Sequence, residues 1–162
     1  MRSPFRIDAM ADADVASADQ LREATGLDAA QLRTELARPW ARLWVAREDA
    51  GEVVAMLVAW HVSDELHVLN VATRAEHRRR GAARSLLQTM LAYARGNRIE
   101  HVLLEVRRSN RGAIELYRAL GFFAMGIRAR YYPDDEDAVE MVLALDTATG
   151  AIKPHADEVR FE

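Results

Sequence analysis

Three consecutive arginines at positions 78–80 stand between two segments of different character. The apolar, β-branched segment before them ends near Thr73, and Gly81 with two alanines opens a long amphipathic helical pattern after them. The first turn of a helix presents free N–H groups and partial positive charge, glycine lets a ligand approach the backbone, and guanidinium groups bind phosphate in two places at once. The spacing predicts a phosphate cradle at residues 78–84; the alternative it leaves open is a solvated basic loop.

The elements that must hold this loop alternate between strand and helix only in the middle of the chain. Strands are predicted over Phe5–Asp8, Leu43–Arg47, Val53–Val62, Leu66–Thr73, His101–Arg107, Phe122–Tyr132 and Ala138–Leu145. Helices are predicted over Asp12–Ala24, from Asp28 to just before Pro39, after Gly81 up to Gly96, and from Asn110 to Gly121. This order predicts an α/β protein with a mixed central sheet of about six to seven strands, a central βαβ unit and about four helices. The unit places the arginine loop, defined as residues 78–81, at the carboxyl end of a strand, where α/β proteins usually bind ligands.

The length of 162 residues suits one domain, which we expect at residues 1–146. Residues 147–162 are polar and contain Pro154, so a loosely held tail is expected there. The N-terminal residues lack the apolar core of a signal peptide, and no apolar run approaches the roughly 18 residues of a membrane span. A cytoplasmic location without a membrane partner is therefore expected.

Composition excludes several kinds of chemistry. The absence of cysteine rules out disulfides, thiolate metal sites and a cysteine acyl-enzyme. Lys153 is the only lysine, which disfavours a catalytic or phosphate-binding lysine. A net charge of -3 and a pI near 6.0 argue against a nucleic-acid partner. The histidines at positions 61, 67, 77 and 101 lack zinc-site spacing, so they are interpreted as structural or surface residues, and no metal is expected.

The segment Arg78-x-x-Gly81-x-Ala83 resembles the acetyl-CoA motif of the GNAT family of N-acetyltransferases. Further segments follow at that family's spacing: Leu104-Glu105-Val106-Arg107, Ser109-Asn110, Ala113-Ile114, Leu116-Tyr117, Leu120-Gly121-Phe122 and Arg130-Tyr131-Tyr132-Pro133. The resemblance covers about residues 66–145 and is similar to the branch that acetylates the N-terminal alanine of a ribosomal protein. It implies the GNAT fold, acetyl-CoA as co-substrate and a protein or peptide N-terminus, such as a basic ribosomal-protein tail, as partner. It also implies a monomer or weak homodimer.

The resemblance further implies the residues of the site. Glu105 would be the general base and Tyr117 the general acid. The cofactor-binding residues would be Val71, Ala72, Thr73, Arg78, Arg79, Arg80, Gly81, Ala82, Ala83, Arg84 and Asn110. The chemistry supports these roles independently, because an α-amine with a pKa near 8 must lose a proton before it attacks a thioester. The leaving thiolate needs a proton or hydrogen bond, which a tyrosine hydroxyl can give.

Each of these three residues also has a purely structural interpretation. Without the family, Glu105 on a strand would pair with a neighbouring arginine, Arg107 or Arg108. Tyr117 would be an amphipathic core tyrosine, and Asn110 would be a helix cap or turn residue.

The chain departs from the ribosomal-protein enzymes in its first third. Thr25-Gly26-Leu27-Asp28 stands where those enzymes carry a Pro-Trp pair, and the Pro39-Trp40 of this chain follows the second predicted helix instead. Because this region commonly forms one wall of the acceptor site in the family, the acceptor stays open. The alternatives are an N-acetyltransferase of a small-molecule amine and a non-catalytic acyl-CoA-binding regulatory module. The acidic turn Asp134–Asp137 is expected to be solvated or to attract a basic peptide.

Overall fold

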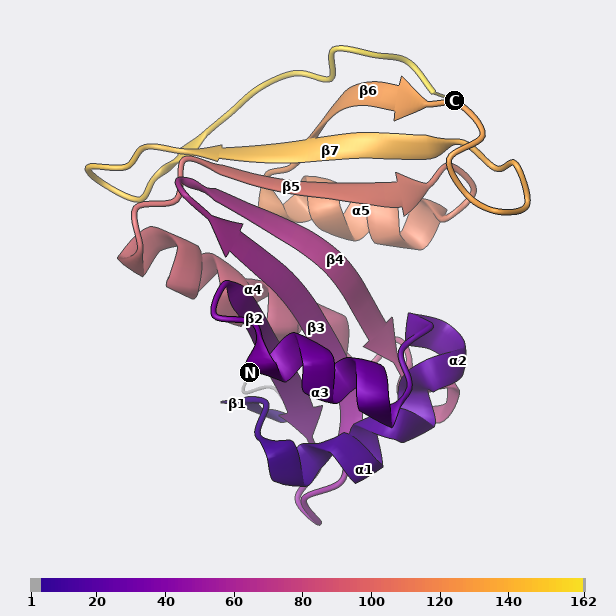
Figure 1. Cartoon of the computed structure of the whole chain (residues 1–162). Coiled ribbons are helices and arrows are strands. Elements are labelled where there is room, and N and C mark those ends of the chain that lie inside the picture. Colours follow the sequence, from indigo (N-terminus) through magenta and orange to yellow (C-terminus); the bar gives the residue numbers. More distant parts are fainter. Residues whose placement is uncertain (1–3, 162) are drawn as a thin grey trace. The chain divides into compact units, whose positions relative to one another are not determined.

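The computed structural model describes residues 4–161, which form a mixed α/β sheet with helices (Figure 1). Its strands are β1 (Arg6–Ala9), β2 (Ala41–Arg47), β3 (Val53–Val62), β4 (Glu65–Thr73), β5 (His101–Arg107), β6 (Phe123–Arg128), β7 (Ala138–Leu145) and β8 (Ile152–Lys153). Its α-helices are α1 (Val15–Ala18), α2 (Arg22–Thr25), α3 (Ala29–Ala37), α4 (Ala82–Gly96) and α5 (Arg111–Leu120). The strands follow the order β1-β2-β3-β4-β5-β7-β6, and β8 pairs with β7. The predicted mixed sheet is confirmed, with β4, α4 and β5 consecutive in the chain as a βαβ unit requires.

The chain divides into two compact units, each described here by itself. Unit 1 comprises residues 1–61 and 68–93, and unit 2 comprises residues 62–67 and 94–162. Strand β4 and helix α4 contribute residues to both units. Among residues 4–161, no helix is long and apolar enough to cross a membrane.

Unit 1 is built on the antiparallel strands β1, β2 and β3. Seven residues of β3, from Val53 to Ala59, are buried, because an uninterrupted apolar run can face protein on both sides of a sheet. Strands β2 and β3 are consecutive and antiparallel, so they form a hairpin. Gly51 in its turn has φ +89°, a conformation that favours glycine.

The helix predicted over Asp12–Ala24 is instead four short pieces. The segment consists, in order, of a 3₁₀ turn at Asp12–Asp14, α1, a second 3₁₀ turn at Asp19–Leu21 and α2. The side chain of Asp14 accepts a hydrogen bond from the Ala11 N–H at 2.8 Å and from Arg47 on β2 at 2.6 Å. Because the Asp14 side chain bonds to the Ala11 backbone and to Arg47, it favours a short turn at this point over a continuous helix.

The other helices begin and end where local chemistry predicts. Asp28 and Gln31 form a reciprocal capping box at the start of α3. Helix α4 buries one apolar stripe, which consists of Ala82, Leu86, Leu87, Met90, Leu91 and Ala94. Helix α5 begins at Asn110, whose side chain accepts from the Ala113 N–H at 3.2 Å, and ends at Gly121 with φ +111°.

Unit 2 contains β5, β7 and β6, with β7 antiparallel to both neighbours. Alternate residues of β5 are buried, so His101, Leu103, Glu105 and Arg107 share the half-buried face. The strand predicted over Phe122–Tyr132 ends early, at Arg128. Arg130 turns the chain with φ +56°, and its N–H donates to Asp137 Oδ1 at 3.0 Å.

The expectation of a loosely held tail is wrong. Strand β8 pairs with the end of β7, which adds a strand beyond the predicted sheet. Further along, the Glu158 N–H donates to the Ala124 carbonyl at 2.8 Å, and Asp157 accepts from the Ala124 N–H at 2.9 Å. Phe161 is buried, and its carbonyl accepts from Arg108 Nε at 2.7 Å. The open edge of β6 thus obtains partners that a polar sequence alone does not reveal.

Candidate active site

The backbone of the arginine loop turns sharply before α4. Arg79 has φ +63° and Gly81 has φ +87°, both in the left-handed region. No acceptor for the backbone N–H groups of residues 79–84 is found among residues 4–161, whereas the Ser85 N–H donates to the Gly81 carbonyl at 3.0 Å. A run of free N–H groups at the start of a 15-residue helix is a binding site for an anion.

The loop is anchored by the β2–β3 hairpin of the same unit. His77 Nε2 lies 2.6 Å from Glu48 Oε1, and the Arg74 N–H donates to the Val54 carbonyl at 2.8 Å. The Arg74 side chain also forms an ion pair with Glu52. Because these contacts precede the loop, they fix where its backbone turns without using the side chains at positions 78–80.

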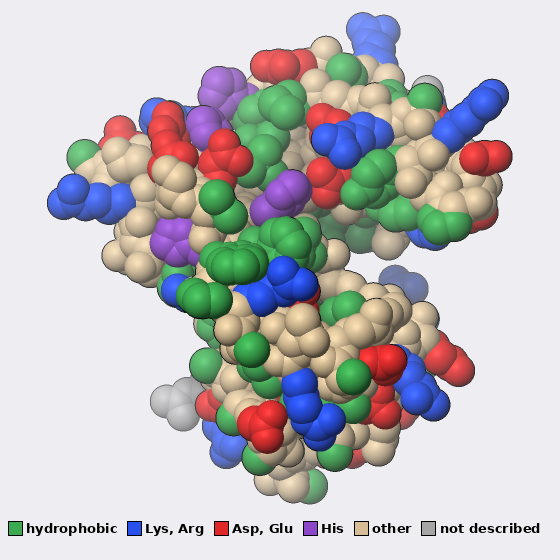
Figure 2. Space-filling view, in the orientation of Figure 1, with side chains coloured by type: hydrophobic (Ala, Val, Ile, Leu, Met, Phe, Trp, Pro, Cys, Tyr) green, Lys and Arg blue, Asp and Glu red, His purple; other side chains and the backbone are tan. Residues whose placement is uncertain are grey.

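The arginines of the loop remain open to solvent. Arg78, Arg79 and Arg84 are exposed, and none of them forms an ion pair within residues 4–161. Arg80 approaches Glu48 at only 3.9 Å, and its guanidinium lies 5.8 Å from the Phe5 ring centroid. On the face drawn in Figure 2, Lys and Arg side chains are interspersed with Asp and Glu rather than gathered into one basic surface. These observations favour a local anion site.

The end of β4 lies beside a cavity. Ala72 is buried, while Val71 and Thr73 are half-buried. The Thr73 carbonyl accepts from Arg78 Nε at 3.4 Å. A cavity of about 430 Å³ is lined by Thr73, residues 74–76 and Arg78 on one side and by residues of the α2 region on the other. The strand end, the loop and a hollow that admits a ligand therefore meet within unit 1.

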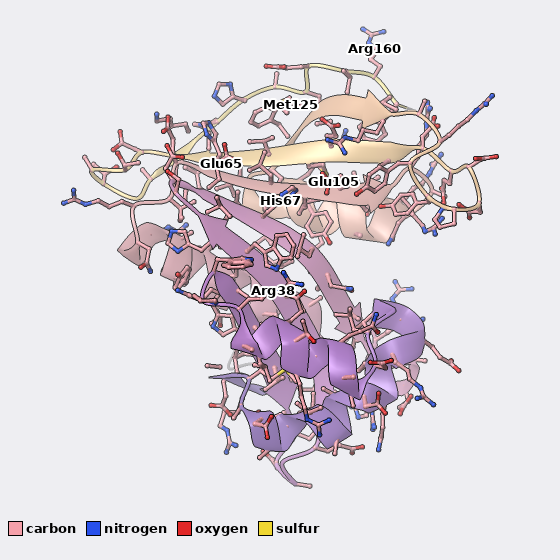
Figure 3. All side chains as sticks on the ribbon, in the orientation of Figure 1. Arg38, Glu65, His67, Glu105, Met125 and Arg160 are labelled. Atoms are coloured by element: carbon pink, nitrogen blue, oxygen red, sulfur yellow. The ribbon has the colours of Figure 1, made fainter. Side chains whose placement is uncertain are left out.

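Glu105 on β5 faces His67 of β4 within unit 2. His67 Nε2 lies 3.3 Å from Glu105 Oε1, and their labelled side chains lie next to each other in Figure 3. The interpretation of Glu105 as a partner of Arg107 or Arg108 is wrong. Arg107 binds Asp134 and Glu136, and Arg108 binds Asp137. His67 was not singled out by the sequence, because its partner lies 38 residues away.

Tyr117 on α5 is buried, and its ring packs against Phe122 at 5.7 Å between centroids. Burial raises the pKa of Tyr117 to about 12, with a smaller contribution from the nearby Tyr132. Hydrogen bonding contributes nothing to this shift among residues 4–161. A tyrosine hydroxyl that stays protonated at neutral pH can donate a hydrogen bond to a reacting group.

Asn110 and the acidic turn have structural tasks. The Asn110 side-chain oxygen caps α5, as the structural interpretation expected. Three of the four acidic residues at 134–137 are paired with arginine, since Asp134 and Glu136 share Arg107 and Asp137 holds Arg108. The Arg107 hydrogen bond lowers the pKa of Asp134, and the backbone N–H of Arg130, with a smaller contribution from Arg108, lowers the pKa of Asp137. The turn therefore offers a basic peptide less free charge than its sequence suggests.

The predicted site residues form two groups. Val71, Ala72, Thr73 and the seven residues 78–84 are brought together in unit 1. Glu105, Tyr117 and Asn110 belong to unit 2, where Glu105 has a histidine partner. Among the described residues there is no group of three or more His, Cys, Asp or Glu side chains that could hold a metal ion.

A family model for the acetyltransferase (GNAT) family matches residues 8–122, most of the chain. The chain therefore belongs to this family, and the predicted family is confirmed. The match covers β4, the arginine loop, α4, β5 and α5, and so includes both groups of predicted site residues.

Individual relatives of the chain are also N-acetyltransferases. Over 98 residues the chain is 36% identical to the [ribosomal protein bS18]-alanine N-acetyltransferase of Escherichia coli K12; this region is 59% of the chain and 66% of that relative. It is 37% identical over 118 residues to an N-alpha-acetyltransferase of Sulfurisphaera tokodaii, covering 65% of the chain and 70% of the relative. The crystal structure of the Escherichia coli ribosomal-protein-S18-alanine N-acetyltransferase matches with a TM-score of 0.78 and 25% identity, over 95% of this chain and 97% of that one.

Proposed function

We propose that this protein is an acetyl-CoA-dependent N-acetyltransferase that acts on the N-terminal α-amine of a protein, with alanine as first residue. The observation that carries the proposal is the arginine loop, because its free N–H groups and unpaired guanidinium groups suit a pyrophosphate. The similarity to enzymes that acetylate ribosomal-protein alanine or protein α-amines supports the choice of acceptor. If the acceptor is a ribosomal protein, as proposed, the enzyme works in the cytoplasm.

Each predicted site residue has a task in this proposal. Val71, Ala72 and Thr73 offer backbone groups to the acyl and pantetheine portions of acetyl-CoA, residues 78–84 bind its pyrophosphate, and Asn110 contacts its arm. Glu105 takes the proton from the α-amine, directly or through a water molecule. Tyr117 gives a hydrogen bond or proton to the leaving thiolate. The absence of cysteine excludes a cysteine acyl-enzyme, and in this proposal the acetyl group passes directly from thioester to amine in a ternary complex.

Aligning amine and thioester supplies more of the rate than either proton transfer. Positioning can contribute roughly 7 to 11 kcal/mol, whereas a general acid or base typically contributes about a hundred- to ten-thousand-fold. The raised pKa of Tyr117, about 12, keeps its hydroxyl protonated throughout the range in which an α-amine becomes neutral. Activity should therefore not fall between pH 7 and pH 10 through loss of the Tyr117 proton.

The test incubates the protein with acetyl-CoA and unblocked peptides that begin with alanine, serine, methionine or proline. Thiol release and peptide mass are followed together. Addition of one acetyl group to the α-amine of Ala-initiated peptides is expected, with loss of most activity in Glu105→Gln combined with Tyr117→Phe. Ping-pong kinetics, or an unchanged rate in this double variant, would contradict the mechanism.

The same assay separates the two alternatives. Thiol release with small amines and without peptide product would identify a small-molecule acetyltransferase. Tight acetyl-CoA binding without thiol release for any acceptor would identify a regulatory module.

A further inference from the structure

The contact between Glu105 and His67 joins a shielded group to an exposed one. The Glu105 side chain is 17% exposed and that of His67 is 41% exposed, while His67 Nε2 lies 3.3 Å from Glu105 Oε1. An imidazole with its proton on Nδ1 can accept a proton at Nε2, and one with its proton on Nε2 donates to the carboxylate. His67 is thus the more exposed member of the pair, and the two labelled side chains lie next to each other in Figure 3.

Other charged groups near Glu105 lie on β7 and β6. Glu140 of β7 is the register partner of Glu105, and Arg128 of β6 holds Glu140 with Nε 2.5 Å from Oε1. The hydrogen bond with Glu140 raises the pKa of Arg128, and burial raises the pKa of Tyr132, which follows β6; the charge of Glu105 adds a smaller contribution to both. Arg128 keeps its charge at every working pH, whereas an imidazole exchanges protons near neutrality.

The proposed reaction must release a proton. A protonated α-amine and acetyl-CoA give an amide and a free thiol; one of the two protons lost by nitrogen goes to the thiolate and the other goes to solvent. If Glu105 takes the second proton, it must lose it before the next turnover. The Glu105 side chain is only 17% exposed, and its histidine partner, at 41%, offers this proton a more open route to water.

We infer that His67 is the positioning residue through which Glu105 returns its proton to solvent. The inference rests on the proposed function and adds a residue to its mechanism. The Glu105 carboxyl O–H gives its proton to His67 Nε2, and the exposed imidazole gives a proton to water or buffer. This transfer needs no other co-reactant.

The test replaces His67 by Gln, with His67→Asn as a second variant. Both side chains can hydrogen-bond but neither carries a proton near neutral pH. The turnover number with an Ala-initiated peptide is expected to fall about tenfold, with KM for acetyl-CoA within twofold of the original protein. Added imidazole should restore turnover in a saturable manner, because a small base can take the proton in place of the missing side chain. The matched control is His101→Gln on the same face of β5, which should change neither value.

The possible results decide between distinct conclusions. Full turnover in both His67 variants, or a loss that imidazole does not restore, would overturn the relay and leave His67 a structural contact. Absence of transfer to any peptide by the unmodified protein would instead overturn the proposed function, and the inference with it. Restoration by imidazole in the His67 variants alone supports the relay, because a merely structural role does not respond to a free base.

Discussion

Arg47 and the arginines of the arginine loop lie in the same unit and use the same side chain in opposite ways. Arg47 forms two hydrogen bonds with Asp14, at 2.6 and 2.8 Å, and its Nε donates to Asp8 at 2.7 Å. Its side chain is 14% exposed and that of Asp14 only 9%. Arg78 and Arg79 are exposed and form no ion pair with a carboxylate within residues 4–161.

The difference lies in what remains available for a ligand. The donors of Arg47 are committed to two carboxylates, so this arginine connects β2 to β1 and to the segment before α1 and has nothing to offer an anion. Apart from the contact of Arg78 Nε with the Thr73 carbonyl, the exposed loop arginines keep their donors in water, where each gains little for folding but can bind phosphate. We therefore expect stability and cofactor affinity to depend on separate arginines.

The largest effect should follow from Arg47→Met. Removing one partner of a mostly buried ion pair leaves the Asp14 carboxylate uncompensated, at a cost of about 3 kcal/mol in free energy of unfolding. Urea denaturation measures this loss, and KM for acetyl-CoA should stay unchanged in the folded variant. Adding Asp14→Leu should recover part of the stability, since the unpaired charge is then gone; no recovery would show that packing of Arg47 dominates.

The opposite result is expected from Arg78→Ala combined with Arg79→Ala. Loss of charge-assisted hydrogen bonds to the pyrophosphate should raise KM for acetyl-CoA about tenfold or more, with little change in the melting temperature. Higher salt should weaken cofactor binding in the unmodified protein more than in this variant. The control is Arg33→Ala on α3, an exposed arginine outside the loop; an equal rise in KM there would remove the distinction.

Gly81→Ala and Gly51→Ala form a matched pair with smaller effects. Both glycines have φ near +90° and open space where a Cβ would lie, so each substitution should cost about 1 kcal/mol of stability through backbone strain. Only Gly81→Ala should also raise KM for acetyl-CoA, because it shifts the N–H groups at the start of α4. Equal KM values in the two variants would contradict binding by this backbone.

The smallest expected effect is the dependence of stability on acid, which arises from the ion pairs of Arg47 with Asp8 and Asp14. Hydrogen bonds from Arg47 hold the pKa values of Asp8 and Asp14 below their usual range. A lowered folded-state pKa adds stability above the unfolded pKa near 3.9, and this stability disappears as pH falls through the folded value. Unfolding free energy measured from pH 7 to pH 2 should therefore fall below about pH 4, and more weakly in Arg47→Met.

Features encoded within a few residues of one another could be predicted. The Asp28–Gln31 capping box, the Asn110 cap and the turn at Gly81 are all local, and each lies where the sequence placed it. The polar tail was misinterpreted, because its contacts with Ala124 and Arg108 depend on a strand edge that the tail sequence does not describe.

The sequence by itself determined the family, the order of elements and the arginine loop, because periodicity, helix caps and the Arg-x-x-Gly-x-Ala pattern act over short distances. Tertiary structure alone decided which arginines are neutralised and which are free. It also brought His67 to Glu105 from 38 residues away and divided the Asp12–Ala24 segment through Arg47. These contacts depend on strand pairing and burial, so the identities of the residues alone could not predict them.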